Sequence, residues 1–207
     1  MKCFTLDEVK RFTATAKTSK HYALFLLAIQ TGMRPEEYLG LQWKDIDLEK
    51  GVLSVRRALI ARKGGGYYFA ETKTKQSRKN INIQETLISE LRRHKASQWT
   101  QMNRLGSDYE HNDLVFATNW GSPLDHANLA ERIFKGLRDK ANVSKIRLYD
   151  LRHTTATLML SSGENPKIVS ERPGHASIVL TLDTYSHVLP TMQKDACDRL
   201  EKMMFGI

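Results

Sequence analysis

Apolar residues recur at helical spacing along much of the chain, and this pattern predicts a mostly α-helical fold. Thr5 and Glu8 have the spacing of a capping box, in which each side chain accepts a hydrogen bond from the backbone amide of the other residue. A helix should therefore begin at Leu6. We expect Leu6, Val9 and Phe12 to form its core face.

The second apolar stretch, residues 19–31, predicts a helix that Ser19 caps and that ends at Gly32, a common stop signal. Pro35 suits the first turn of a short third helix. This arrangement puts Arg34 at the helix start and Glu37 about one turn further on, where a carboxylate can orient the guanidinium. The alternative is an ordinary surface ion pair, which contributes little to stability.

Three shorter segments read as strands of one small antiparallel sheet: Val52–Val55, Tyr67–Phe69 and Ile81–Ile83. The turn before the last strand, residues 72–79, holds four cations in eight residues. A charge run of this kind is typical of a solvated loop that contacts phosphate.

Helical spacing returns after this sheet. A helix over residues 84–104 should turn five apolar side chains inward, and Asp125 is a plausible cap for a helix that ends near Ala141. The inward residues would be Leu87, Ile88, Leu91, Trp99 and Met102. Four cations of the Asp125 helix are candidates to line DNA: Arg132, Lys135, Arg138 and Lys140.

The last part of the chain predicts three more helices and an apolar stripe. Gly163 should end one helix, Asn165 and Pro166 should start a short one, and Ile178–Val188 should form another. Beyond Pro190 the apolar positions either pack on the chain's own core or dock on a neighbouring protomer. They are Met192, Ala196, Leu200, Met203 and Phe205. The whole pattern predicts an α+β fold, mainly α-helical with a small three-stranded antiparallel sheet, in a single domain of residues 1–207.

Composition narrows the class of partner. With 207 residues and 41% hydrophobic content, the chain can bury one sizeable core. Lys and Arg number 32 against 23 Asp and Glu, a formal charge of +9, so we expect a polyanion, most simply nucleic acid, as the partner. Cys3 and Cys197 lack a metal or redox spacing and read as free thiols. No apolar run approaches the roughly 18 residues of a membrane span, and we expect a cytoplasmic protein without membrane contact.

The segment from Leu148 to Val188 concentrates candidate chemistry. Arg152 lies in an otherwise apolar helix, where a permanently charged guanidinium needs an anionic partner. That partner is either a phosphate or a core carboxylate such as Asp150 or Glu171. Cations beside a tyrosine favour its phenolate, so Tyr185 is either a nucleophile for phosphorus or an ordinary half-buried aromatic residue.

Four separate boxes in one order resemble the tyrosine recombinases, the phage and transposon integrase family, over nearly the whole chain. They are TGMRPEEYLGLQWKDID, the hairpin ETKTKQSRKNINI, RLYDLRHTTATLML, and the Gly174–His175 pair followed by TLDTYSHV. The resemblance implies a catalytic domain for site-specific recombination, with Tyr185 forming a 3′-phosphotyrosine link to DNA. It also implies residue roles: Arg34, Arg152 and His175 hold the charge on the phosphate, Lys73 protonates the leaving oxygen, and Glu37 orients Arg34.

The same resemblance implies double-stranded DNA as the partner, a homotetramer on paired DNA sites with weak self-association without DNA, and no metal or cofactor. This sequence departs from the family pattern at Tyr149, where a histidine is usual, and at Pro173, where an aliphatic residue is usual. A phenol can donate to a phosphate oxygen but is no near-neutral proton shuttle. His153 reads as a structural histidine, and His187 reads as either a packing residue or a contact to the DNA backbone.

Members of the family usually carry an N-terminal DNA-binding module, and from the resemblance we expect residues 1–207 to be the catalytic domain without it. Two alternatives to a recombinase follow from these departures and from the shared residue set. One is a nicking and resealing enzyme of the type IB topoisomerase kind. The other is a non-catalytic, DNA-binding remnant of an integrase.

Overall fold

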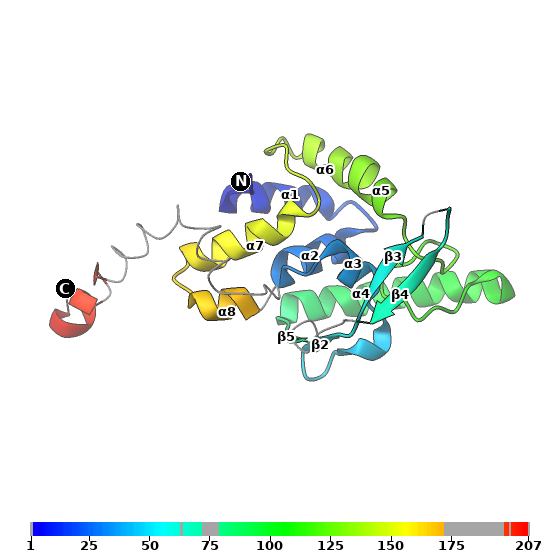
Figure 1. Cartoon of the computed structure of the whole chain (residues 1–207), viewed down its shortest axis with the longest axis horizontal. Helices are drawn as coiled ribbons and strands as arrows, with labels where there is room; N and C mark the ends of the chain where they lie inside the picture. The colour runs from blue at the N-terminus through cyan, green and yellow to red at the C-terminus, as the bar shows by residue number, and fades with distance from the viewer. Residues whose placement is uncertain (1, 63, 72–78, 172–196, 199, 207) are drawn as a thin grey trace.

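A computed structural model describes residues 2–62, 64–71, 79–171, 197–198 and 200–206 of the chain (Figure 1). The helices are α1 (Leu6–Ala16), α2 (Tyr22–Thr31), α3 (Pro35–Leu39), α4 (Glu85–Leu105), α5 (His126–Asn128), α6 (Lys135–Lys140), α7 (Asp150–Ser161) and α8 (Pro166–Glu171). The strands are β1 (Ile46–Asp47), β2 (Val52–Val55), β3 (Arg57–Ala61), β4 (Tyr67–Glu71) and β5 (Lys79–Asn82). Short 3₁₀ turns cover Trp43–Asp45 and Gly106–Asp108, and the π-helix Leu129–Phe134 joins α5 to α6.

Helix α2 is the centre of the fold. It contacts α1, α4 and α7, which surround it in Figure 1. Seven of its ten residues are buried, because it is apolar on nearly every side. The ring of Phe25 on α2 packs in a cluster of four aromatic rings whose contacting centroids are 5.4 to 6.5 Å apart. The other three rings are those of Phe4, Phe12 and Phe134. This core fixes the two ends of α2, and the C-terminal end leads directly to Arg34.

The first helices confirm most of the sequence predictions. Thr5 and Glu8 form the expected capping box, and α1 begins at Leu6. The prediction that Leu6 faces the core is wrong, since Leu6 is 55% exposed while Phe12 is buried. The reason is that α1 packs on α2 and α6 through Phe12 and Ala16, beyond its first turn. Ser19 does not cap α2 either. Its hydroxyl accepts from the backbone amide of His21, and His21 is itself the N-cap residue of α2.

The β structure forms two sheets rather than one. A three-stranded antiparallel sheet exists, in the order β1-β2-β5, and β3 pairs with β4 in a separate two-stranded ribbon. The prediction that Tyr67–Phe69 joins the strands on either side of it is therefore wrong. Arg56, between β2 and β3, is the point where the chain leaves one sheet for the other. A two-residue strand such as β1 is too short for periodicity to reveal.

Helix α4 runs well past the core. Leu87, Ile88 and Leu91 are buried as expected, but Trp99 is 60% exposed and Met102 is only partly buried. The inward placement predicted for Trp99 is wrong, because the core contacts of α4 lie in its first two turns. Within the described residues, no helix has the length and apolar character needed to cross a membrane.

The C-terminal residues do not pack as a core stripe. Residues 200–205 are helical, and Leu200, Met203 and Phe205 are 57%, 85% and 66% exposed. Core packing of these three side chains on their own chain, one of the two sequence-based alternatives, is therefore wrong. Cys3 and Cys197 are both free thiols, as predicted.

Candidate phosphate site at the start of α3 and α7

The end of α2 positions the first candidate residue. Gly32 adopts a left-handed conformation, φ 65°, which stops the helix and turns the chain toward Arg34. Pro35 then opens α3. Glu37 reaches back one turn, and its two oxygens accept from the Arg34 backbone amide and from the Arg34 guanidinium, each at 2.9 Å. These contacts place the Glu37 carboxylate against the Arg34 guanidinium, and a role of Glu37 in orienting Arg34 for a reaction stays a prediction.

The burial of Glu37 excludes the alternative that Arg34 and Glu37 form an ordinary surface ion pair. The Glu37 side chain is 5% exposed, whereas the Arg34 side chain keeps 37% of its surface exposed. A buried carboxylate needs full compensation by cations or donors. Glu37 therefore fixes the inner side of the guanidinium and leaves the outer side of Arg34 facing solvent.

Arg152 approaches Arg34 from a different part of the chain. Helix α7 packs on α2, where the Thr155 hydroxyl donates to the Ile29 carbonyl at 2.6 Å. The Arg152 guanidinium is 2% exposed and donates to the Gly32 carbonyl at 3.0 Å. A cation is favoured at this helix end, since the last carbonyls of a helix carry partial negative charge. Arg34 lies only two residues beyond the carbonyl that Arg152 contacts.

Asp150 is not the carboxylate that compensates Arg152. Both of its oxygens accept from the Arg147 guanidinium, at 2.9 and 3.1 Å, and Arg147 also donates its backbone amide. Burial raises the pKa of Asp150, but the hydrogen bonds from Arg147 outweigh it and the net shift is downward. This ion pair closes the first turn of α7. The other carboxylate considered from the sequence, Glu171, has no described side chain.

Lys79 belongs to the site although the sequence analysis assigned it only to a charged turn. It begins β5, and its ammonium lies 3.4 Å from Glu37 with 9% of the side chain exposed. Burial lowers the pKa of Lys79 to about 8, with Arg152 and Arg34 acting in the same direction and Glu37 opposing them. A signal for this placement existed: in a strand, residues two apart share a face, and Ile81 and Ile83 are buried.

Arg34, Glu37, Lys79 and Arg152 together are called the cationic cluster below. Three cations and one carboxylate give it a net charge of +2 among side chains that are mostly buried. Arg56, Arg57 and Glu71 line a hollow of about 540 Å³ beside Lys79. Arg57 forms a close ion pair with the buried Asp45, which fixes the start of β3. The cluster thus lies next to an open, polar face rather than inside a closed cavity.

Tyr149 lies at the entrance of the same helix as Arg152. It is the residue before α7, is 37% exposed, and its ring meets the His153 ring edge-on at 5.6 Å. Burial lowers the pKa of His153, although the Asp150 carboxylate opposes this shift. His153 therefore stays neutral near pH 7 and supports Tyr149 by packing, in agreement with a structural role.

Lys73, His175 and Tyr185 lie outside the described residues, as do Pro173 and the Ile178–Val188 helix. Of the predicted site residues, the structure brings together Arg34, Glu37 and Arg152, adds Lys79, and places Tyr149 at the start of α7. No group of three His, Cys, Asp or Glu side chains within the described part of the chain could hold a metal ion.

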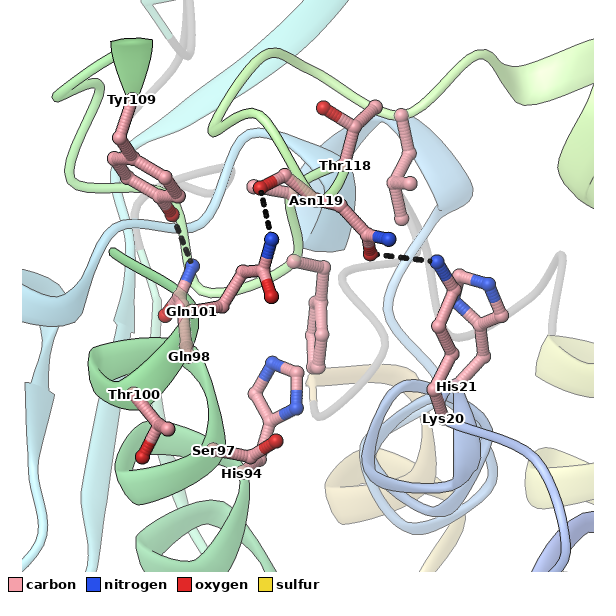
Figure 2. Close-up of a pocket in the computed structure, with 13 residues that line it drawn as sticks. Lys20, His21, His94, Ser97, Gln98, Thr100, Gln101, Tyr109, Thr118 and Asn119 are labelled. Carbon is pink, nitrogen blue, oxygen red and sulfur yellow. Dashed lines mark hydrogen bonds between the residues drawn. The ribbon is translucent and has the colours of Figure 1, made fainter. Parts of the chain in front are cut away.

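A second polar hollow lies elsewhere, between α4, the turn before α2 and residues 116–119. Figure 2 shows it, with a volume of about 350 Å³, and we call it the His21 pocket. Lys20 donates to the Asn119 side chain at 2.9 Å, and Gln98 donates to the Tyr109 hydroxyl at 3.1 Å. Burial lowers the pKa of His21 to about 4, so this histidine is neutral at physiological pH. The polar groups of this pocket mostly bind one another.

Comparison with known proteins identifies the family to which this fold belongs. The sequence profile of the phage integrase family matches residues 2–192. A tyrosine recombinase XerC-like protein of Caldanaerobacter subterraneus subsp. tengcongensis is 35% identical over 97% of this chain and 54% of its own length. The ICEBs1 integrase of Bacillus subtilis is 29% identical over 99% of this chain and 55% of its own.

A solved structure shares the fold. The Tn1549 transposon integrase, in complex with transposon right end DNA, superposes with a TM-score of 0.80 at 24% identity, over 96% of this chain and 66% of that one. The chain belongs to the phage integrase family of tyrosine recombinases. It spans about half the length of the two sequence relatives named above.

Proposed function

We propose that this chain is the catalytic domain of a site-specific DNA recombinase that cuts and rejoins strands through a 3′-phosphotyrosine link. The observation that carries the proposal is the cationic cluster, in which Arg34 and Arg152, 118 residues apart in sequence, are held at the same helix end. Guanidinium groups fixed by protein acceptors are preorganised to bind a phosphate diester. Membership of the phage integrase family supports the same chemistry.

In the proposed reaction Tyr185 loses its phenol proton to water, and the resulting phenolate oxygen attacks the scissile phosphorus. A bond forms between the tyrosine oxygen and phosphorus while the bond to the 5′ oxygen breaks, and Lys73 supplies the proton that this leaving oxygen takes up. Arg34, Arg152 and His175 stabilise the charge on the non-bridging oxygens, and Tyr149 donates to the same phosphate. Attack by a 5′ hydroxyl of another strand then releases Tyr185 and completes the exchange, without a metal or cofactor.

Double-stranded DNA is the proposed substrate, and a homotetramer on paired sites is the proposed assembly. The surplus of positive charge supports the first point, and so does the Tn1549 transposon integrase with its bound DNA. The exposed Leu200, Met203 and Phe205 support docking of the C-terminal residues on a neighbouring protomer. We expect this assembly to form in the cytoplasm, on DNA.

The proposal is tested with a suicide duplex, nicked so that the cleaved fragment diffuses away and the covalent product accumulates. Duplexes carrying the end sequences of the source element are incubated with this chain and with Tyr185→Phe, and the products are separated under denaturing conditions. We expect a protein–DNA band that requires Tyr185. Equal DNA binding by both proteins without any band would contradict the proposal and favour the non-catalytic remnant.

A second arm separates recombination from simple nicking and resealing. A labelled acceptor strand with a free 5′ hydroxyl is added to the covalent product. Joining of the two different duplexes is the expected result. Resealing of the original strand alone, with supercoil relaxation but no joining, would favour the topoisomerase alternative.

A further inference from the structure

The fourth member of the cationic cluster, Lys79, has no role in the reaction as proposed above. Its ammonium lies 3.4 Å from the Glu37 carboxylate, and its side chain is 9% exposed. The same Glu37 oxygen accepts the Arg34 backbone amide, while the other accepts the Arg34 guanidinium. The carboxylate is thus shared by two cations that come from different elements, the start of α3 and the start of β5.

Charge counting shows what this sharing does. With Lys79 protonated, the three cations and the one carboxylate of the cluster have a net charge of +2. Without the charge of Lys79, the group of Arg34, Arg152 and Glu37 has a net charge of +1. In a water-poor site the attraction between Glu37 and Arg34 would then offset most of the positive charge that Arg34 presents to a phosphate. The second cation relieves Arg34 of that neutralisation.

We propose that Lys79 is a positioning residue, which binds the Glu37 oxygen that the Arg34 guanidinium does not use and thereby keeps the full charge of Arg34 directed at the scissile phosphate. This inference rests on the proposed function. It predicts that the charge of Lys79 matters more than its chemical identity. It also predicts that loss of Lys79 is relieved when Glu37 loses its charge as well, because Arg34 and Arg152 then carry +2 again.

The surroundings of Lys79 make its protonation state relevant near neutral pH. The facing groups are Glu37 and Arg34 on the α3 side, Arg152 on α7, Arg56 between β2 and β3, Arg57 on β3, and Glu71 on β4. Burial lowers the pKa of Lys79 to about 8, and the two arginines of the cluster add to this effect. Arginine at this position would stay charged at every pH that the folded protein tolerates.

The functional arm compares rates of covalent product formation on the suicide duplex between pH 6 and pH 10. At pH 7 we expect Lys79→Arg to retain most of the rate and Lys79→Met to lose about 10-fold or more. We expect Glu37→Gln/Lys79→Met to recover part of that loss. The ratio of the wild-type rate to the Lys79→Arg rate should be constant below pH 7 and fall above pH 8.

Three results would overturn the inference. They are a wild-type rate in Lys79→Met at pH 7, a double variant slower than Lys79→Met, and a rate ratio that does not change with pH. A residue that only supports the fold would change the melting temperature and the rate together, whereas the inference predicts a loss of rate in variants that remain folded. Thermal melting of each variant identifies any loss of rate that is due to unfolding.

A second arm does not depend on catalysis. Lysine side-chain resonances of the free protein are titrated by NMR, and we expect one lysine with a pKa near 8 that is missing in Lys79→Arg. In Glu37→Gln the same pKa should fall further, because the carboxylate raises it. Lysines that all titrate near 10.5 would overturn the inference. The expected lysine pKa near 8, together with no covalent product from the wild type, would instead count against the proposed function.

Discussion

The cationic cluster and the His21 pocket are both polar regions near α2 and each adjoins a hollow, but the cluster retains positive charge whereas the buried histidine of the pocket is neutral. The cluster gathers three cations around one buried carboxylate. The His21 pocket holds the exposed Lys20, which is bound to a neutral amide, and His21, whose pKa burial lowers to about 4. Both hollows enclose several hundred cubic ångströms. Retained positive charge, rather than the size of a hollow, distinguishes the candidate phosphate site.

The comparison has a physical basis in desolvation. A buried histidine can release its proton, so the His21 pocket lowers its electrostatic cost by becoming neutral. Arginine cannot do this at any ordinary pH, and Arg152 remains charged at 2% exposure. A site that keeps such a group must bind an anion for part of its working cycle or compensate it permanently.

The largest expected effect comes from removing the most buried cation of the cluster. Arg152→Ala should lower the rate of covalent product formation by about 1000-fold, because a preorganised donor to the phosphate oxygens is lost. Single-turnover cleavage of the suicide duplex measures this rate. Arg93→Ala, on the exposed face of α4, is the matched control and should change it less than about 2-fold. A similar loss in both variants would show that general charge, rather than the cluster, drives cleavage.

The next effect concerns the carboxylate at the centre of the cluster. Glu37→Gln leaves Lys79 and Arg34 without their shared anion, so we expect the free energy of unfolding to fall by about 3 kcal/mol. For a chain of this size the melting temperature should drop by roughly 6 to 12 °C. Asp47→Asn, which removes an exposed pair with Lys50, is the control and should change stability little. An unchanged melting temperature in Glu37→Gln would mean that the pair is not buried in solution.

A smaller effect should distinguish the His21 pocket. The folded-state pKa of His21 is lowered, so its neutral form is present in the fold while the unfolded chain takes up a proton below pH 6.5. Stability should therefore decrease as the pH falls from about 6.5 to about 4, by about 2 kcal/mol from this residue. Denaturant unfolding of the wild type and of His21→Gln measures the difference. Parallel pH curves for the two proteins would contradict the neutral, buried state of His21.

The smallest effect is expected at Lys20, whose side chain bonds Asn119 at the rim of the His21 pocket. Lys20→Ala should change the unfolding free energy by less than about 0.5 kcal/mol and the cleavage rate by less than about 2-fold. Both assays above provide the measurement. A loss of cleavage comparable to that of Arg152→Ala would make the His21 pocket part of the phosphate site and would break the comparison.

Much of the fold and several site residues could be predicted from local sequence signals. The capping box of α1, the glycine stop of α2, Pro35 at the start of α3 and the Asp125 cap all act within a few residues. Local signals also placed Glu37 one turn after Arg34. Such features depend on the backbone chemistry of a few neighbouring residues, so they can be predicted directly from the sequence.

The features that sequence analysis missed depend on contacts between distant segments. The division of the strands into two sheets depends on how β3 and β4 pair, and the exposure of Trp99 depends on where the core stops along α4. Lys79 was assigned to a solvated turn because it follows a run of cations. Its burial depends on Glu37, 42 residues earlier, and only the alternation with Ile81 and Ile83 indicated it.

The positive charge of Arg152 should act directly on the negative charge of the scissile phosphate. The most direct test of this interaction replaces one non-bridging oxygen of that phosphate with a methyl group. The methylphosphonate lacks the negative charge that Arg152 would balance. The rate loss of Arg152→Ala relative to wild type is measured on both duplexes. We predict a loss of about 1000-fold on the normal duplex and a loss at least about 10-fold smaller on the neutral one. An equal loss on both duplexes would contradict the account.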